Sequence, residues 1–360
     1  MKKTKHLLVD LSTHGFGHFA QTSMVLNALQ ALHLPLRVTI RSKLPESIVR
    51  ERLDLPVNSI SYALDIGLKM HNPVEIDREA SYHYYQSLHQ HYEQAVEREV
   101  EVLKTLQADC ILANVPYLSL SAAARLNIPS VAMCSLNWAE IFAYYCADYP
   151  EAKAIARQIR EAYASAEHFL AVTPAMPMPG LSNLQSIPPI AHRGQRQTDN
   201  LRKAVNNPQA QFVLVNLGGI PNTLDTSNWP RLDNVFWIIG SGVQSTRADI
   251  VSQDAFDMAF IDLLSSCQAV LTKTGYGMLV EATSNQVPVI CITRNGWPEE
   301  PALFSWVREK GYLQLIQLSE FNAGDFADAA KQALNTSWQK PTTASNGAEI
   351  AAKLLANYLK

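Results

Sequence analysis

Lys273-Thr274-Gly275-Tyr276-Gly277 joins a short apolar strand, predicted over residues 268–271, to an apolar helix-forming segment that starts Met278-Leu279-Val280-Glu281-Ala282. The free N–H groups and the dipole of a helix start attract anions. Glycine allows the backbone to approach a phosphate closely because it carries no Cβ. The turn therefore predicts a phosphate site with Lys273 as a neighbouring cation. A tight turn without a ligand fits these five residues equally well.

The turn belongs to the second of two similar series of strands and helices. In the first series, apolar strands are predicted at residues 6–11, 36–40, 109–113 and 130–134. The helical patterns between them cover residues 19–32, 75–106 and 118–126. In the second series, strands are predicted at residues 212–217, 235–239, 269–271 and 287–292. Strands that alternate with helices in this way are typical of parallel sheets with helices on both faces.

A proline-rich stretch with few periodic apolar residues, 173–208, separates the two series. The chain has 360 residues, of which 47% are hydrophobic, and this exceeds the usual size of a single core. We therefore expect an α/β protein with two Rossmann-like, doubly wound parallel-sheet domains facing a central cleft. The expected parts are an acceptor domain at 1–185, a donor domain at 205–345 and a C-terminal helix at 346–360 that packs back on the first domain.

Composition excludes several classes of protein. The net charge is -3 and charged residues make up 18% of the chain, whereas a nucleic-acid binder should show a basic patch. The five cysteines are widely spaced and form no CxxC, so neither a disulfide framework nor a zinc site is predicted. No uncharged apolar run reaches the roughly 18 residues needed to span a bilayer. These features favour a cytoplasmic protein without an integral membrane segment.

The loop His14-Gly15-Phe16-Gly17-His18 follows the first predicted strand, at the edge where open α/β sheets bind ligands. It matches GxGxxG only loosely, and no acidic residue ends the second strand, which disfavours a dinucleotide site. His18 falls in the first turn of the next helix, where an imidazole can take a proton from a hydroxyl at neutral pH. A histidine that caps or packs the loop is the alternative. The two glycines between His14 and His18 make a shared zinc ion an unfavourable interpretation.

The second series carries further candidates for ligand binding. Glu281 lies in the helix after the glycine turn and can accept hydrogen bonds from the vicinal hydroxyls of a ribose, or it is a solvated helix residue. The loop after strand 287–292 contains Arg294, Glu299 and Glu300, which can grip sugar hydroxyls or form a polar surface. Gly218-Gly219 follows a strand and is either a second phosphate loop or a simple turn.

Two further observations concern the first series. Asn137, Trp138 and Glu140 follow its fourth strand, where they can line an acceptor pocket or cap and pack the next helix. The chain contains no GxSxG motif and no nucleophile signature around its cysteines, so a serine or cysteine hydrolase is not indicated.

Together these features resemble the GT-B glycosyltransferases, especially family 28-type enzymes and the glycosyltransferase-like N-terminal domain of L-arabinokinases. The resemblance spans nearly the whole chain and is carried by the His14–His18 loop, Asn137-Trp138, the glycine turn with Glu281-Ala282, and Arg294 with Glu299-Glu300-Pro301. It implies an inverting transfer from a nucleotide-sugar, usually a UDP-sugar, to a hydroxyl acceptor of unknown identity. It also implies that no metal or other cofactor is needed, with His18 as the base.

The resemblance implies that Gly275 and Gly277 hold the diphosphate, Glu281 the ribose, and Glu299 and Glu300 the donor sugar. With the other candidates, we expect two sets of binding residues. The donor set is Gly15, Gly17, Gly218, Gly219, Lys273, Thr274, Gly275, Tyr276, Gly277, Glu281, Arg294, Glu299 and Glu300. The acceptor set is Asn114, Asn137, Trp138 and Glu140.

The sequence departs from the family pattern at two positions. Lys273 stands where many of these enzymes have histidine or serine, and Asn114 ends the third strand where related proteins often carry aspartate. A carboxylate partner for His18 is therefore not evident, because Asp10 is close in sequence but sits on a strand. Two alternatives remain open, a nucleotide-sugar 2-epimerase of the same fold and a non-catalytic nucleotide-sugar-binding protein.

Overall fold

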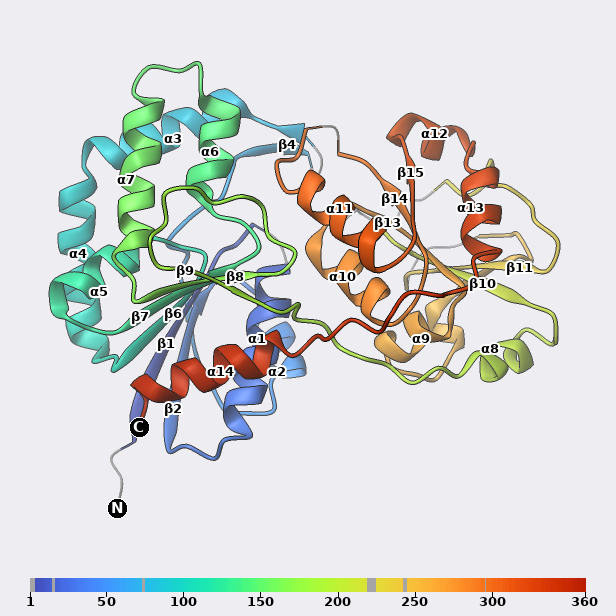
Figure 1. Cartoon of the computed structure of the whole chain (residues 1–360), viewed down its shortest axis with the longest axis horizontal. Helices are drawn as coiled ribbons and strands as arrows, with labels where there is room; N and C mark the ends of the chain where they lie inside the picture. The colour runs from blue at the N-terminus through green and yellow to red at the C-terminus, as the bar shows by residue number, and fades with distance from the viewer. Residues whose placement is uncertain (1–3, 15–16, 73–74, 219–224, 242–244, 295) are drawn as a thin grey trace. The chain divides into compact units, whose positions relative to one another are not determined.

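The computed structural model describes residues 4–14, 17–72, 75–218, 225–241, 245–294 and 296–360. The chain divides into two compact units (Figure 1). Unit 1 comprises Met1–Ile190 and Asn346–Lys360, and unit 2 comprises Ala191–Ser345. The chain therefore passes from the first unit to the second within the proline-rich stretch and returns to the first for its last helix.

Unit 1 contains a seven-stranded, wholly parallel sheet in the order β3-β2-β1-β6-β7-β8-β9. Its strands are β1 (Lys5–Leu11), β2 (Leu36–Ser42), β3 (Asn58–Ser61), β6 (Cys110–Asn114), β7 (Ser130–Cys134), β8 (His168–Val172) and β9 (Leu184–Ile187). Beside this sheet, β4 (Met70–Asn72) and β5 (Glu75–Ile76) form an antiparallel pair. The central strands are buried on both faces, as expected of apolar strands in a doubly wound sheet.

Helices cover both faces of this sheet (Figure 1). They are α1 (Gly17–Gln30), α2 (Glu46–Arg52), α3 (Arg78–Gln90), α4 (Tyr92–Leu106), α5 (Leu118–Leu126), α6 (Trp138–Cys146), α7 (Ala152–Ala164) and α14 (Gly347–Tyr358). The C-terminal α14 packs against α1, while α4, α5 and α7 pack together. The single helix expected over 75–106 is wrong. Asp77 caps α3 by accepting the N–H of Ala80, and His91, with ψ of 28°, interrupts the helix before α4 begins.

Unit 2 contains a six-stranded parallel sheet in the order β12-β11-β10-β13-β14-β15. Its strands are β10 (Gln211–Asn216), β11 (Val235–Ile239), β12 (Ile250–Ser252), β13 (Ala269–Lys273), β14 (Val289–Ile292) and β15 (Leu313–Ile316). Its helices are α8 (Thr198–Ala204), α9 (Phe260–Ser266), α10 (Tyr276–Ser284), α11 (Glu300–Lys310), α12 (Leu318–Ala323) and α13 (Ala327–Leu334), with a 3₁₀ turn at Gln253–Ala255.

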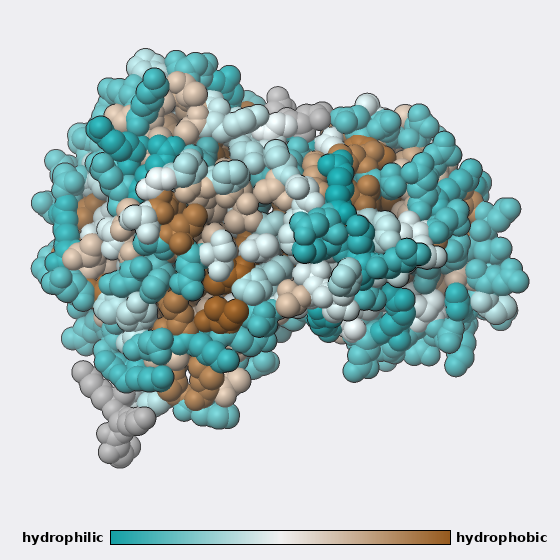
Figure 2. Space-filling model, viewed as in Figure 1, coloured by the Kyte–Doolittle hydropathy of each residue, from teal (hydrophilic) through white to brown (hydrophobic). Residues whose placement is uncertain are grey.

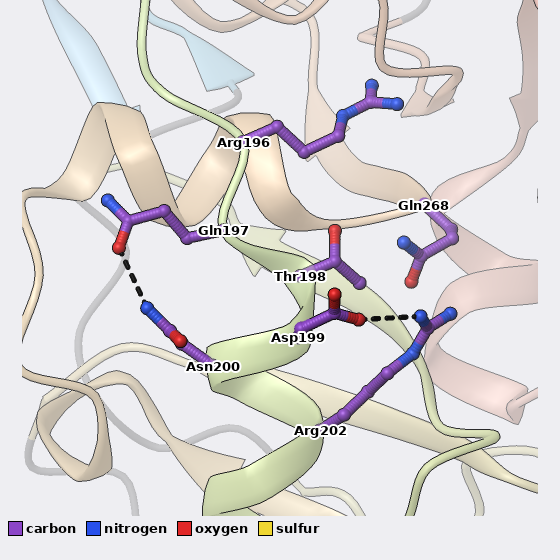
Figure 3. A pocket seen from close by; sticks show the side chains of 7 residues that line it. All are labelled: Arg196, Gln197, Thr198, Asp199, Asn200, Arg202 and Gln268. Carbon is purple, nitrogen blue, oxygen red and sulfur yellow. Dashed lines mark hydrogen bonds and ion pairs between the residues drawn. The ribbon is translucent and has the colours of Figure 1, made fainter.

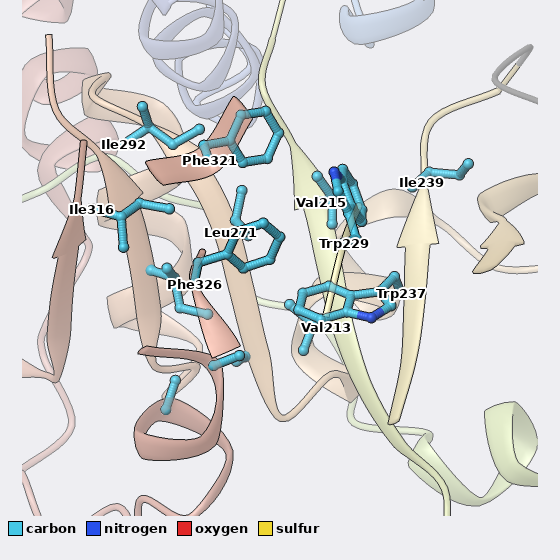
Figure 4. Close-up of a cluster of buried hydrophobic side chains, with 14 of the residues drawn as sticks. Val213, Val215, Trp229, Trp237, Ile239, Leu271, Ile292, Ile316, Phe321 and Phe326 are labelled. Carbon is cyan, nitrogen blue, oxygen red and sulfur yellow. The ribbon is translucent and has the colours of Figure 1, made fainter. Parts of the chain in front are cut away.

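An aromatic cluster fills one face of this second sheet (Figure 4). Trp237 meets Phe326 edge to face, with 5.5 Å between ring centroids, and Trp229 meets both of them. Such edge-to-face pairs add to the stabilisation gained by burying the rings.

On the surface of both units, hydrophilic residues dominate the face seen in Figure 2. Most of the large apolar side chains are therefore buried in the hydrophobic cores around the two sheets.

Both sheets reverse their strand order at one place. In unit 1 this switch lies between β1 and β6, and in unit 2 it lies between β10 and β13. Ligands of open α/β sheets bind beyond the carboxyl ends of the strands at such a switch. The loops that follow β1, β6, β10 and β13 are therefore the expected positions of ligand-binding residues. The two parallel-sheet α/β units confirm the fold class predicted from the sequence.

Candidate functional site

His18 and Asn114 meet at the switch point of unit 1. His18 lies in the first turn of α1, after β1, and Asn114 is the last residue of the neighbouring strand β6. The imidazole Nδ1 is 2.9 Å from the amide Oδ1 of Asn114. Both side chains are buried, with 7% of His18 exposed. Asn114, expected in an acceptor pocket, is therefore the side-chain partner of His18.

The surroundings of Asn114 determine which ring nitrogen of His18 carries the proton. The amide Nδ2 of Asn114 lies 3.3 Å from the carbonyl oxygen of His18 and 3.1 Å from the hydroxyl of Thr22. A backbone carbonyl can only accept, so Nδ2 must face it and Oδ1 must face the imidazole. Oδ1 is itself only an acceptor, so Nδ1 of His18 donates. The Nε2 lone pair is then left to accept a proton.

Burial lowers the pKa of His18, and the hydrogen bond with Asn114 offsets part of this shift. Neutral imidazole is therefore the form present at pH 7, as a base requires. Asp10, the nearest carboxylate in the sequence, does not orient this ring. Its two oxygens accept from Arg41 at 2.6 and 2.8 Å. Arg41 also pairs with Glu99 of α4 at 2.7 Å, so Asp10, Arg41 and Glu99 form a buried triad.

Cys134 completes a cysteine, histidine and asparagine set. Its Sγ lies 3.6 Å from the Nδ1 of His18. In thiol hydrolases the histidine uses one ring nitrogen for the cysteine and the other for the amide that orients it. Here Cys134 and Asn114 approach the same nitrogen, so the set cannot work as such a relay. This geometry agrees with the sequence, which showed no nucleophile signature.

Trp138 packs beside both histidines of the loop. Its ring centroid lies 5.9 Å from that of His18 and 5.3 Å from that of His14. The indole is fully buried and donates through Nε1 to Asp65 at 2.6 Å. Trp138 therefore supports the histidine loop from within the unit.

The other two expected acceptor residues have structural partners. Asn137 caps α6, because its side-chain oxygen accepts the N–H of Glu140 at 2.8 Å. The two carboxylate oxygens of Glu140 accept hydrogen bonds from Nε and Nη2 of Arg160, at 2.7 and 2.9 Å. The structure therefore brings Asn114 and Trp138 to His18, while Asn137 and Glu140 fix the helix that carries Trp138.

The glycine turn lies at the switch point of unit 2. Lys273 ends β13, Gly275 precedes α10, and Gly277 lies in its first turn. A Cβ added to Gly275 or Gly277 would meet no described heavy atom within 4 Å, and the same holds for Gly17 and Gly240. At Gly324, by contrast, the added Cβ would lie 1.9 Å from a backbone oxygen. Packing thus explains Gly324 but not the glycines of the turn, which face open space.

Lys273 supplies a cation beside this open turn. Burial lowers the pKa of Lys273, and the charge of Arg294 lowers it further. Among the residues that the structure describes, no ion pair involves Lys273. Two nearby cations at a helix start make a region suited to an anionic group.

Glu300 joins the turn to the loop after β14, and Glu299 holds Trp297 within that loop. Glu300 accepts the hydroxyl of Thr274 at 2.5 Å and the backbone N–H of Arg294 at 2.7 Å. Glu299 accepts the indole N–H of Trp297 at 3.2 Å, and both carboxylates are buried. The guanidinium of Arg294 lies over the Trp297 ring at 4.3 Å. These contacts join the loop after β14 to the turn after β13.

Glu281 has a partner that the sequence did not indicate. Its Oε1 is 3.1 Å from Nδ1 of His192, in the segment that leads into unit 2. His192 lies in a proline-rich stretch without periodicity, so no local pattern marked it. In the loop after β10, Gly218 has φ of +46° and donates its N–H to the side-chain oxygen of Asn216 at 3.0 Å. Gly15 and Gly219, also expected in the donor set, lie outside the described residues.

A hollow of about 460 Å³ opens elsewhere on unit 2 (Figure 3). It is lined by Arg196, Gln197, Thr198, Asp199, Asn200, Arg202 and Gln268. Gln268 precedes β13, so the hollow lies at the amino end of that strand, opposite the glycine turn. Its polar groups already bond to one another or to the backbone, as in the pairs Arg202–Asp199 and Asn200–Gln197. The loops at the switch points are therefore better candidates for the functional site than this hollow.

The described parts of the chain show neither a candidate metal site nor a candidate membrane span. No group of three histidine, cysteine or acidic side chains is placed to hold a metal ion. No helix combines the length and the apolar character needed to cross a bilayer.

Comparison with solved structures places these features in a known fold. The calicheamicin glycosyltransferase CalG4 matches with a TM-score of 0.64 at 14% identity, over 99% of each chain. A UDP-glucosyltransferase from Polygonum tinctorium matches with a TM-score of 0.58 at 13% identity, again over 99% of each chain. The chain has the GT-B fold. The UDP-GlcNAc 2-epimerase of Methanocaldococcus jannaschii also matches, with a TM-score of 0.53 at 13% identity over 98% of this chain and 99% of the epimerase.

At the level of sequence, the chain is 28% identical over 319 residues to an L-arabinokinase from Arabidopsis thaliana. The match covers 83% of this chain but 29% of that protein, so the chain spans less than a third of its length. No family profile matches the chain. The GT-B fold predicted from the sequence is confirmed, and the partial match to an arabinokinase agrees with the resemblance described above.

The geometry of the His18–Asn114 pair makes a prediction about charge. Asn114→Asp places a carboxylate beside Nδ1, and an opposite charge at this distance favours the protonated ring. We expect the pKa of His18 to rise by about one unit or more. Histidine ring signals followed by NMR across a pH titration, with the His18 signal assigned from His18→Ala, measure this shift. His6 and His89, which do not contact Asn114, are controls in the same spectra, and an unchanged or lower pKa at His18 contradicts the assignment.

Proposed function

We propose that the chain is a glycosyltransferase that moves a sugar from a nucleotide-sugar donor, a UDP-sugar by resemblance, to a hydroxyl group of an acceptor. The observation that carries the proposal is a pair of features at the two switch points. At one lies a neutral histidine whose Nδ1 donates to Asn114, which leaves the Nε2 lone pair to accept a proton. At the other lies a glycine turn that faces open space beside Lys273. The GT-B fold of the chain supports the same activity.

In the proposed reaction, the acceptor hydroxyl gives its proton to Nε2 of His18 while its oxygen attacks the anomeric carbon of the donor sugar. The bond from that carbon to the diphosphate breaks, and UDP leaves from the opposite side, so the configuration inverts. The N–H groups around Gly275 and Gly277, together with Lys273, offset the charge of the departing diphosphate. The reaction then requires no metal ion. The ribose hydroxyls would compete with His192 for Glu281.

The contacts of the acidic residues weigh against a 2-epimerase. That reaction needs a carboxylate-rich centre, and the candidates are Glu140, Glu299 and Glu300. Arg160 holds Glu140, while Glu299 and Glu300 support the loops of unit 2. One observation favours a non-catalytic nucleotide-sugar-binding protein as the second candidate. Asn114 cannot stabilise a positive charge on His18 as a carboxylate would, which weakens the base.

Removal of the base distinguishes a transferase from a binder. In His18→Ala we expect the rate of UDP release from the donor to fall about 10²- to 10⁴-fold, the usual contribution of a general base. The dissociation constant of UDP should stay nearly the same, because the ring does not belong to the nucleotide site. Product analysis by chromatography and calorimetric titration with UDP measure the two quantities. His83→Ala, which removes an exposed histidine of α3, is the matched control. Equal turnover in the His18 variant would remove the histidine from the mechanism.

The glycine turn makes a separate prediction about the donor. Gly277→Ala adds a methyl group in open space at the start of a helix, where alanine is tolerated better than glycine. We expect an unchanged or slightly higher melting temperature, with UDP affinity reduced about tenfold or more because the methyl group occupies the approach of the phosphate. In the contrasting variant Gly324→Ala, the melting temperature should fall, since the Cβ meets Asn228 and φ is +77°. Undiminished UDP affinity in Gly277→Ala would remove the turn from the donor site.

A further inference from the structure

Asp65 lies between β3 and β4 and joins the loop after β1 to the start of α6 in unit 1. Its Oδ1 accepts the hydroxyl of Ser12 at 2.9 Å, and its Oδ2 accepts the indole N–H of Trp138 at 2.6 Å. The backbone N–H of Thr13 also donates to it. Ser12 and Thr13 follow β1 and lead to α1, whereas Trp138 begins α6. One buried carboxylate thus connects the turn before His18 with the ring that packs beside His18.

The donors around Asp65 require a carboxylate. An indole N–H and a backbone N–H can only donate, and a buried donor without an acceptor is costly. A carboxylate has two oxygens and can serve all three donors, whereas an amide has one acceptor atom. Asp65 is therefore matched to its partners by the number of acceptors it offers.

The segment that carries Asp65 is itself fixed against the histidine loop. Gly67 has φ of +61°, and a Cβ added there would lie 2.7 Å from Cβ of His14. The carbonyl oxygen of Gly67 accepts the hydroxyl of Tyr85 from α3 at 2.9 Å. Asp65 is thus held at a defined position relative to the loop, as a residue that orients others must be.

We propose that Asp65 is a positioning residue, which acts through Trp138 and the turn before α1 to keep His18 oriented for proton transfer. The proposal rests on the proposed function of His18. Asp65 does not contact the imidazole in this arrangement. Its influence passes through the indole, whose ring lies beside both His14 and His18.

The charged and titratable groups around Asp65 set its protonation. Burial, together with the charge of Asp10, raises the pKa of Asp65 to about 6, while the hydrogen bonds from Ser12, Trp138 and Thr13 act to lower it. Asp10 is paired with Arg41, which also binds Glu99. Tyrosines of α3, the β6–α5 loop and α7 also face Asp65, namely Tyr84, Tyr85, Tyr117 and Tyr163. Protonation below this pKa removes an acceptor from the network, so the orientation of Trp138 should change as the pH falls through it.

The test uses the full chain labelled with 5-fluorotryptophan and with ¹⁵N-histidine, and it needs no turnover. The Trp138 signal is assigned from Trp138→Phe, and the His18 signal from His18→Ala. In the wild-type protein we expect the ¹⁹F signal of Trp138 to titrate near pH 6. In Asp65→Asn that titration should disappear, and the ring signals of His18 should shift. Glu99→Gln, which removes a neighbouring buried carboxylate without touching Trp138, should preserve the titration and leave the His18 signals in place.

Kinetics then connect position with catalysis. Asp65→Asn should lower kcat about tenfold or more, as a small misplacement of a catalytic group does, with an unchanged dissociation constant for UDP. In the Trp138→Phe background the same substitution should add little, because the contact through which it acts is gone. If Asp65→Asn does not fold, Trp138→Phe alone must lower kcat about tenfold or more, with an unchanged dissociation constant for UDP. Unshifted His18 signals in the folded variants would overturn the proposal. If the His18 signals shift but His18→Ala keeps full activity, the proposed base is refuted, while the positioning role of Asp65 still stands.

Discussion

The hydrogen bond between Nδ1 of His18 and Oδ1 of Asn114 is the contact on which the proposed chemistry depends. It joins the first turn of α1 to the end of β6, where the strand order of the first sheet reverses. The amide is oriented by a backbone carbonyl that can only accept, so the ring is held in the tautomer whose Nε2 can accept a proton. An asparagine thus orients the ring without supplying a charge that would stabilise its protonated form.

The donor site proposed for the second unit rests on different features. Its core of tryptophan and phenylalanine rings supports the sheet, while the loops at the switch point are joined by Glu300 through Thr274 and Arg294. Because the acidic residues are used to hold the loops, the turn itself offers N–H groups, open space and Lys273. A nucleotide diphosphate requires these features, since its charge must be balanced without blocking the approach of its oxygens.

The sequence predicted features that arise from local patterns, and it missed those that depend on distant residues. Apolar runs such as 212–217 and 269–271 predicted buried strands because such runs bury side chains on both faces of a sheet. The helical pattern of 75–106 did not reveal the break at His91, which divides this stretch into two helices. The contacts of Glu140 with Arg160, of Glu281 with His192 and of Asp65 with Trp138 join residues 20 to 89 positions apart. No periodicity marks such pairs, so a carboxylate that holds a loop looks the same in sequence as one that binds a sugar.

The most direct test of the account is a thermal-unfolding panel with UDP, TDP, GDP and ADP, each with EDTA and then with magnesium. A ligand at about 100 times its Kd stabilises the native state by roughly 2.7 kcal/mol, which is a visible shift in melting temperature. We expect UDP to give the largest shift in melting temperature, and we expect the same shift in EDTA. A protein that no nucleotide stabilises, or one that responds only when magnesium is present, would contradict a metal-independent nucleotide-sugar site at the glycine turn.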